Sequence, residues 1–308
     1  MTPAAPALGL VGTGAVGQAV GAALVAAGLC EQLLVASRTH AQAAALADDL
    51  DDMRAAIGSP VRPSAAEVPD LRECAAVVVA ARARFTNTRH TDVRMGGAQA
   101  NAPTIRALAR HLTRYPRTVL VVTNPVDLMT RLFAEESSCP RVFGIGSNLD
   151  SARYRLTLAR HLGVPVAAVH GHVIGEHGDA AVVCASSTTV NGHPVPVPLQ
   201  EVRDELAGRP GRINAGIGRT RCGPAGAVVS TLRLALGVED GMTELSVPYG
   251  EDCCGIPLRF TGGQPLPSVP LLDPFEVRQL EAARTKLRAA YGVVRGVPAQ
   301  PLPSGRNL

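Results

Sequence analysis

Near its start the chain reads Leu8-Gly9-Leu10-Val11-Gly12-Thr13-Gly14-Ala15-Val16-Gly17, a short apolar run followed by the spacing Gly-x-Gly-x-x-Gly. The apolar run is typical of a buried strand, and the alanine- and valine-rich segment 17–27 is typical of a helix. In such a unit the first glycine makes the tight turn and the second lets the backbone approach a pyrophosphate. The third glycine allows the helix to lie close to the sheet. Because a helix N-terminus also attracts phosphate, residues 12–17 predict a dinucleotide-binding site.

The segments that follow alternate between apolar runs and stretches of helical composition. We predict further strands at 32–36, 75–81 and 118–123, and helices at 41–53 and 102–112. Continuous apolar strands separated by helices are typical of a parallel sheet that is covered on both faces. Right-handed crossovers then produce a doubly wound α/β domain. We expect this Rossmann domain to span residues 1–142.

The rest of the chain has a mixed pattern of strands and helices. At 308 residues the chain is longer than one compact core usually holds, which favours two domains. We expect an α+β catalytic and substrate domain over residues 143–296, with a last long helix over 274–291. The segment 297–308 is rich in proline, which predicts a loose tail.

Bulk composition restricts the class of protein. Hydrophobic residues make up 46% of the chain, but no apolar run is long enough to cross a bilayer. Residues 1–6 lack the basic and apolar regions of a signal peptide, so we expect a cytoplasmic protein without a membrane partner. The net charge of +4 is spread along the chain and only 3% of residues are aromatic. This distribution argues against a nucleic-acid partner.

The seven cysteines show no pattern of a disulfide framework or a metal site. They are scattered apart from the adjacent pair Cys253-Cys254, and no Cys-x-x-Cys spacing occurs. An odd number of cysteines also argues against complete pairing. We therefore expect reduced thiols and no bound metal.

Two polar clusters in the second half of the chain have the residue types of a catalytic site. They are Asn-Leu-Asp-Ser-Ala-Arg at 148–153 and Ile-Gly-Glu-His-Gly-Asp at 174–179. Histidine acts as a general acid and base near neutral pH when a carboxylate orients it, which favours His177 with Asp150. Arg153 has the planar fork that suits a carboxylate. Taken singly, such residues are more often a turn or a surface ion pair, but together after a nucleotide-binding segment they favour catalysis.

Four motifs, in this order, resemble the lactate/malate dehydrogenase family. They lie at residues 12–17, 123–127 (Thr-Asn-Pro-Val-Asp), 148–155 and 175–179. The wording Leu-Asp-Ser-Ala-Arg at 149–153 is similar to the lactate dehydrogenase branch, and 271–291 is similar to the closing helix of the family. The resemblance implies an oxidoreductase that transfers a hydride between a nicotinamide cofactor and C2 of a small 2-oxo/2-hydroxy acid. It also implies a homodimer or homotetramer.

The resemblance implies a role for each matching residue. His177 would give a proton to the substrate oxygen during reduction and take it back during oxidation. Asp150 would orient the imidazole of His177. Arg153 would hold the substrate carboxylate, and Asn124 would contact both the substrate and the nicotinamide side of the cofactor.

The family also has a mobile lid arginine that polarises the substrate carbonyl. Asn101 resembles the asparagine that opens the next helix, where we expect it on the cofactor side, and counting back from it assigns the lid role to Arg94. This role is consistent with the chemistry of the reaction, because transfer of a hydride to C2 of the substrate creates a negative charge on the carbonyl oxygen. A guanidinium and an imidazolium would stabilise this oxyanion where water is excluded.

The lid, residues 82–94, differs from the family pattern because it is longer and lacks a Pro-Gly turn. We expect Arg84 and Arg89 to contact substrate, with Arg82 and Thr88 as competing candidates for the residue that sets specificity. Several arginines are consistent with a second negative group on the substrate, such as a carboxylate or phosphonate, or with a solvated basic loop. Residues 96–97, a Gly-Gly pair, would suit a hinge.

The end of the second strand departs from the pattern that selects NAD. Rossmann sites for NAD carry an acid there, about 20 residues after the glycines, which binds the ribose hydroxyls. This chain has Ser37 and Arg38 instead, and Arg38 would suit the 2′-phosphate of NADP. Thr39 and His40 would add weaker donors. We therefore expect NADP as the preferred cofactor, with NAD as the alternative.

Two other functions fit parts of the pattern. A metal- and NAD-assisted glycosidase of related fold would need a Cys/His metal pair, and the sequence has no such spacing. A dinucleotide-sensing protein would need no catalytic set, so the joint presence of His177, Asp150, Arg153 and Arg94 argues against it.

Overall fold

The computed structural model describes residues 6–89, 92–249 and 251–299. Six parallel strands form the first half of the main sheet, in the order β3-β2-β1-β4-β5-β6. They are β1 (Ala7–Val11), β2 (Gln32–Ala36), β3 (Arg62–Ala65), β4 (Ala76–Val79), β5 (Thr118–Val121) and β6 (Val142–Gly144). All residues of β4 and β5 are buried, as the apolar runs predict. This arrangement confirms the doubly wound α/β fold.

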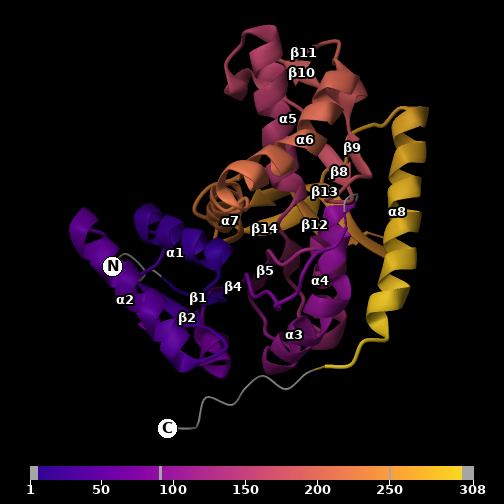
Figure 1. The fold of residues 1–308 in the computed structure, drawn as a ribbon. Helices are drawn as coiled ribbons and strands as arrows, with labels where there is room; N and C mark the ends of the chain where they lie inside the picture. Colours follow the sequence, from indigo (N-terminus) through magenta and orange to yellow (C-terminus); the bar gives the residue numbers. More distant parts are fainter. Residues whose placement is uncertain (1–5, 90–91, 250, 300–308) are drawn as a thin grey trace.

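Helices cover both faces of the parallel strands (Figure 1). On one side α1 (Ala15–Ala27) packs against α2 (His40–Ile57), and on the other α3 (Ala98–His111) packs against α4 (Val126–Ser137). The helix predicted at 102–112 thus begins four residues earlier. Five elements of this half have no counterpart in our prediction. They are β3, β6, α4 and two short 3-10 helices, η1 (Val68–Glu73) and η2 (Val93–Gly97).

The same sheet continues into the second half of the chain with antiparallel strands. The order after β6 is β12-β13-β8-β9, with β14 paired to β13. These strands are β8 (Val173–Gly175), β9 (Ala181–Val183), β12 (Gly241–Tyr249), β13 (Asp252–Thr261) and β14 (Gln264–Pro267). A separate small sheet joins β7 (Val169–His170), β10 (Thr189–Val190) and β11 (His193–Pro194). The second half therefore mixes strands and helices. The proposed boundary at residue 142 coincides with the start of β6.

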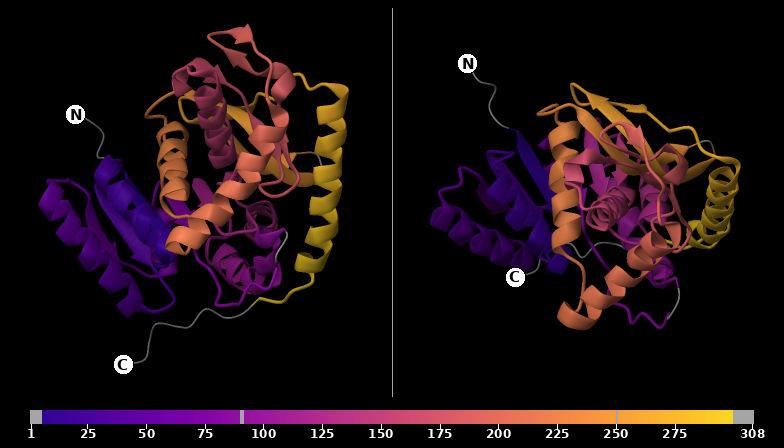
Figure 2. Two further views of the ribbon diagram at one scale, coloured as in Figure 1. Left: turned by 45° about the horizontal axis from the view of Figure 1, so that its top comes forward. Right: turned by 90° about the horizontal axis from the view of Figure 1, so that it is seen from above.

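Four long helices complete this half, and the views in Figure 2 show how they surround its strands. They are α5 (Ser147–Leu162), α6 (Leu199–Ile217), α7 (Cys222–Ala235) and α8 (Pro274–Arg295). Two 3-10 turns, η3 (Val166–Ala168) and η4 (Ala185–Ser187), lie between them in the chain. Helix α8 begins with a capping box of Asp273 and Glu276, and it ends four residues beyond the predicted 291. Residues 300–308 of the predicted loose tail lie outside the described part of the chain.

The glycine turn shows why glycine is needed at two of its positions. Gly12 has a φ of +109°, and a Cβ there would lie 2.8 Å from the backbone of Ala80 and Ala81. A Cβ on Gly17 would overlap the carbonyl oxygen of Gly12, so this glycine lets α1 approach the turn. A Cβ on Gly14 would meet no atom within 4 Å. The open side of Gly14 leaves room for a phosphate at the start of α1.

Candidate active site

A cavity of about 1100 Å³ begins where the carboxyl ends of the parallel strands meet. In open α/β sheets this edge is where ligands bind. Its walls come from the start of α1, the loops after β4 and β5, the lid, α5, the turn after β8, and α6 with the loop that follows. The polar side chains of this wall, together with Val16 of α1, include Arg82, Asn87, Arg94, Asn101, Asn124, Asp150, Arg153, His177, Arg203 and Arg219.

A buried histidine–aspartate pair, His177 and Asp150, lines the cavity. Nδ1 of His177 lies 2.6 Å from Oδ2 of Asp150. The other oxygen of Asp150 accepts a hydrogen bond from Nη1 of Arg153 at 3.2 Å and lies 3.9 Å from Nη2 of Arg94. Gly146 leaves the space for the imidazole, since a Cβ there would lie 2.5 Å from its Cγ. One carboxylate thus faces an imidazole and two guanidinium groups.

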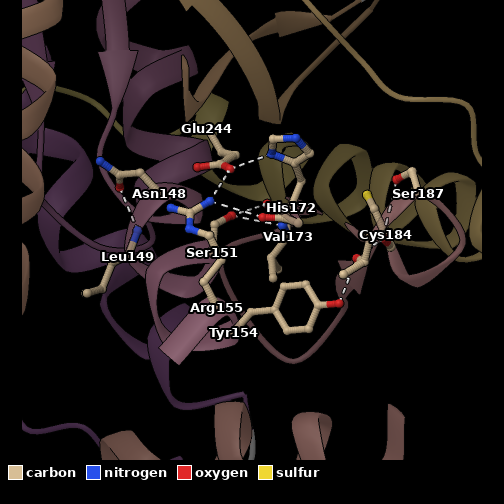
Figure 3. A network of polar contacts seen from close by, with 12 residues as sticks. Asn148, Leu149, Ser151, Tyr154, Arg155, His172, Val173, Cys184, Ser187 and Glu244 are labelled. Atoms are coloured by element: carbon tan, nitrogen blue, oxygen red, sulfur yellow. Dashed lines mark hydrogen bonds and ion pairs between the residues drawn. The ribbon is translucent and has the colours of Figure 1, made fainter. Parts of the chain in front are cut away.

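The position of this pair depends on how α5 is fixed to β8, and Figure 3 shows that network. The hydroxyl of Ser151 accepts from the backbone N–H of Val173 at 2.9 Å. Arg155 donates to the buried Glu244 at 3.0 Å, and Nδ1 of His172 lies 2.6 Å from the same carboxylate oxygen. Because α5 carries Asp150 and β8 leads into His177, these bonds set the distance between the two.

The surrounding charges shift the pKa values of the pair. Burial lowers the pKa of His177 below its usual value, and the charges of Arg94 and Arg153 lower it further against the opposing effect of Asp150. Burial alone would raise the pKa of Asp150, but His177, Arg94 and Arg153 together lower it. The imidazole is therefore neutral and the carboxylate ionised near neutral pH, and the pair is ready to accept a proton.

A second carboxylate, which we did not predict from the sequence, holds the backbone of the histidine. The N–H of His177 donates to Oδ2 of Asp127 at 2.8 Å, and the hydroxyl of Ser246 donates to Oδ1. Asp127 lies in the first turn of α4 and is buried. Its burial raises its pKa to about 7, in spite of these two bonds. The Thr-Asn-Pro-Val-Asp motif was the signal in the sequence for this residue.

The protonation of Asp127 leads to a prediction about stability. An unfolded aspartate has a pKa of about 3.9. Between this value and the folded value of about 7, only the folded state keeps the proton. The free energy of unfolding should therefore fall by roughly 4 kcal/mol as the pH rises through this window, and roughly 3 kcal/mol of this fall lies above pH 5. Asp127→Asn keeps an oxygen that accepts from the N–H of His177, but its side chain does not titrate. The free energy of unfolding of this variant should therefore not show the decrease with pH that Asp127 causes. Urea unfolding of the wild type and of Asp127→Asn from pH 5 to 9 measures how the free energy of unfolding of each depends on pH. The same dependence on pH in both proteins would contradict the prediction.

Two asparagines join the loops at the cofactor end of the cavity. The side chain of Asn101 donates to the carbonyl of Asn124 at 2.7 Å and accepts from the N–H of Ala83 at 2.9 Å. It thus ties the loops after β4 and β5 together. Asn124 follows β5 directly, and both residues line the cavity.

The lid contributes some of the expected residues to the cavity and leaves others outside it. Arg94 lies on η2 and lines the cavity, as do Arg82, which stacks on the ring of Phe85 at 4.1 Å, and Asn87. Arg84, Arg89 and Thr88 are exposed and are not among the residues of the cavity wall. Residues 90–91 lie outside the described part of the lid. No motif in the sequence marked Asn87, or Arg203 and Arg219 on the α6 side, as wall residues.

Ser37 lies where β2 ends, beside the glycine turn. Its hydroxyl is 2.9 Å from Oγ1 of Thr13 and donates to Gln42 at 3.2 Å. Arg38 is exposed. The serine is therefore fixed to the turn, while the arginine extends into solvent next to it.

Neither a metal site nor a membrane segment is found where the structure describes the chain. Residues 6–89, 92–249 and 251–299 contain no group of three His, Cys, Asp or Glu side chains that could hold a metal ion. No helix in these ranges is long and apolar enough to span a bilayer. The seven cysteines are free, and all except Cys222 are buried.

The fold and this cavity define a protein of the dinucleotide-binding α/β class. The family model for the lactate/malate dehydrogenase NAD binding domain matches residues 7–144, and that for the alpha/beta C-terminal domain of the same family matches residues 147–207. The two matches together cover more than half of the chain. The chain belongs to the lactate/malate dehydrogenase family.

Individual relatives agree with this assignment. An L-lactate dehydrogenase of Deinococcus radiodurans is 38% identical over 190 residues, which is 61% of each chain. An L-2-hydroxycarboxylate dehydrogenase (NAD(P)(+)) of Methanocaldococcus jannaschii is 30% identical over 54% of this chain and 58% of its own. The matches thus span about three fifths of these relatives' length. Among solved structures, the malate dehydrogenase from Aeropyrum pernix has a TM-score of 0.84 at 25% identity and covers 93% of this chain and 97% of its own.

Proposed function

We propose that the protein is a nicotinamide-dependent dehydrogenase acting on a small 2-oxo/2-hydroxy acid. The observation that carries this proposal is the buried His177–Asp150 pair, which shares one cavity with Arg153 and Arg94. The same cavity reaches Val16 in the first turn of α1, next to the open side of Gly14. A dinucleotide bound at the glycine turn would therefore have its reactive end near His177.

The residues of the chain would divide the chemistry between them. Arg153 binds the substrate carboxylate, and the nicotinamide, when bound, supplies or accepts the hydride at C2. During reduction Arg94 and the protonated His177 stabilise the negative charge that develops on the substrate oxygen, and His177 gives that oxygen its proton. During oxidation the neutral imidazole takes the proton back.

The same charges would couple substrate binding to proton uptake. In the structure Arg94 and Arg153 lower the pKa of His177. A bound carboxylate offsets these positive charges, so the pKa of His177 rises when a 2-oxo acid binds. The substrate would thus favour the protonated imidazole that reduction needs.

An assay with a panel of substrates tests the proposal. Oxidation of NADPH and NADH is followed with pyruvate, oxaloacetate, longer 2-oxo acids and a 2-oxo acid with a phosphonate group. We expect turnover with at least one of them. Binding of the cofactor without turnover across the panel would refute the proposed activity. Light scattering would test the homodimer or homotetramer that family membership supports.

We further propose that NADP is the preferred cofactor. Ser37 is fixed to the glycine turn through Thr13, and Arg38 is exposed beside it. A guanidinium suits the 2′-phosphate of NADP, and no acid at position 37 repels it. We expect kcat/KM to be about tenfold or more higher with NADPH than with NADH, equivalent to about 1.4 kcal/mol.

A double substitution provides the matched test of this preference. Ser37→Asp adds a carboxylate that repels the 2′-phosphate of NADPH, and Arg38→Ile removes the guanidinium that attracts it. The double variant should therefore prefer NADH. Both cofactors are assayed at the same moderate ionic strength, because salt screens the phosphate contact. A wild-type enzyme that favours NADH would overturn the proposal.

A further inference from the structure

The only lysine of the chain, Lys286, bridges two carboxylates near the active site. It lies on α8, the long helix along one side of the molecule (Figure 1). Its Nζ is 2.8 Å from Oδ1 of Asp92 and 2.8 Å from Oε2 of Glu176. The carboxylates come from parts of the chain that are far apart in sequence, so the ammonium joins the lid to the turn after β8.

Both carboxylates are next to residues that we assign to the chemistry. Asp92 precedes η2, which carries Arg94, and Glu176 precedes His177. The N–H of Asp92 also donates to Oδ2 of Asp179 at 2.9 Å, on the same turn as His177. The lid therefore contacts this turn directly through the N–H of Asp92, and indirectly through Lys286, which binds both Asp92 and Glu176.

The ammonium offsets two unfavourable features of these segments. Glu176 is only 1% exposed, and a buried carboxylate is costly without a cation. Asp92 has a φ of +50°, which is uncommon for a residue with a side chain and must be stabilised by its contacts. Burial would lower the pKa of Lys286, but its bonds to Asp92 and Glu176 raise it overall, so the lysine stays charged. Arg89 also faces Asp92, but at 3.8 Å and from an exposed position.

We propose that Lys286 is a positioning residue, which holds the segment carrying Arg94 against the His177 turn in the geometry that the reaction needs. The proposal rests on the function proposed above. Without Lys286, Asp92 loses its close cation, and Arg94 loses the anchor two residues before it. Lys286 itself does not line the cavity and touches no reacting group in this arrangement.

Kinetics of Lys286→Met, Lys286→Arg and a matched control test the proposal. Displacement of Arg94 by about 1 Å should lower kcat by between about tenfold and about 100-fold in Lys286→Met. The KM of the cofactor should stay within about twofold, and Lys286→Arg should restore most of the rate. Rates are normalised to the cofactor-binding sites, titrated by NADPH fluorescence, to remove the effect of unfolded protein. Arg288→Met is the control, since Arg288 on the same helix also pairs two carboxylates, Asp252 and Glu281, away from the lid.

The pH profile provides a readout that a merely structural role would not change. His177 faces Asp150 and Arg153 from α5 and Arg94 from η2, and its backbone is bonded to Asp127 of α4. Of these groups only Arg94 would move away in Lys286→Met. Because the charge of Arg94 lowers the pKa of His177, the acid limb of 2-hydroxy acid oxidation should move to higher pH. An unchanged profile together with a wild-type kcat would overturn the proposal.

Limited digestion with trypsin tests the contact without any need for turnover. Arg89 and Arg94 are cleavage sites on the lid. Cleavage at these sites should be about tenfold or more faster in Lys286→Met and in Asp92→Asn than in the wild type. The double variant should be cleaved no faster than either single variant, because both substitutions break the same contact. Arg288→Met should be cleaved at the wild-type rate. Equal lid cleavage in all proteins would refute the positioning role, whereas failure of the substrate panel with faster cleavage would refute only the proposed activity.

Discussion

Replacement of His177 by asparagine should reduce turnover by about 10³-fold or more, while the affinity for the cofactor stays within about twofold. Asparagine can still bond to Asp150 but cannot carry a proton between pH 5 and 9, so the substrate oxygen loses its acid and base. His177 lies on the turn after β8, whereas the glycine turn lies between β1 and α1, so the substitution leaves the glycine turn unchanged. Steady-state kinetics gives the loss of turnover, and NADPH fluorescence titration gives the affinity.

Asp150→Asn separates proton transfer from the orientation of the imidazole. This change keeps His177 but removes the charge that faces Arg153 and Arg94. We expect kcat to fall strongly, although less than in His177→Asn, and the KM of the 2-oxo acid not to rise. The two guanidinium groups would then be free to bind the substrate carboxylate. Turnover close to wild type in His177→Asn would contradict the assignment of the whole site.

The parallel half of the fold was predictable because its strands are buried on both faces. The apolar runs at β1, β4 and β5 and the glycine turn are local signals that report directly on burial and on backbone geometry. β3 was not predictable in this way, since its residues Arg-Pro-Ser-Ala are half exposed at the edge of the sheet. The pairing of β6 with β12, which continues the sheet, joins segments about 100 residues apart and has no local signal.

Site residues that belong to a sequence motif could be predicted. Site residues that only a tertiary contact brings to the cavity could not. The motifs mark His177, Asp150 and Arg153, and counting back from Asn101 indicates Arg94. The structure brings these four side chains together. The residues that the structure describes in the lid before η2, 82–89 and 92, have no regular structure. The periodicity of the sequence therefore does not show which lid arginines face the cavity. The contact of Lys286 with Glu176 also could not be predicted from the sequence, because it depends on how α8 packs along the molecule.

The second large effect is expected at Arg153, where lysine keeps the charge but loses the planar fork. Arg153 is 6% exposed and already donates through Nη1 to Asp150, so a bound substrate carboxylate must use its other N–H groups. A lysine ammonium on a flexible stem cannot make the bidentate pair and hold Asp150 at the same time. We expect kcat/KM for the 2-oxo acid to fall by on the order of 10²-fold, about 2.7 kcal/mol. Steady-state kinetics at saturating cofactor measures this loss.

Arg155→Lys is the matched control for this prediction. Arg155 lies two residues further along α5, and it binds Glu244 and the carbonyl of Gly171 rather than the cavity. The control should lower kcat/KM by less than about threefold, since it weakens a bond that fixes α5 but removes none from the substrate. The contrast between the two variants therefore isolates the carboxylate contact from any general loosening of the helix. Unchanged kinetics in Arg153→Lys would mean that the substrate carboxylate binds elsewhere, for which Arg82, Arg203 and Arg219 are the other arginines on the cavity wall besides Arg94.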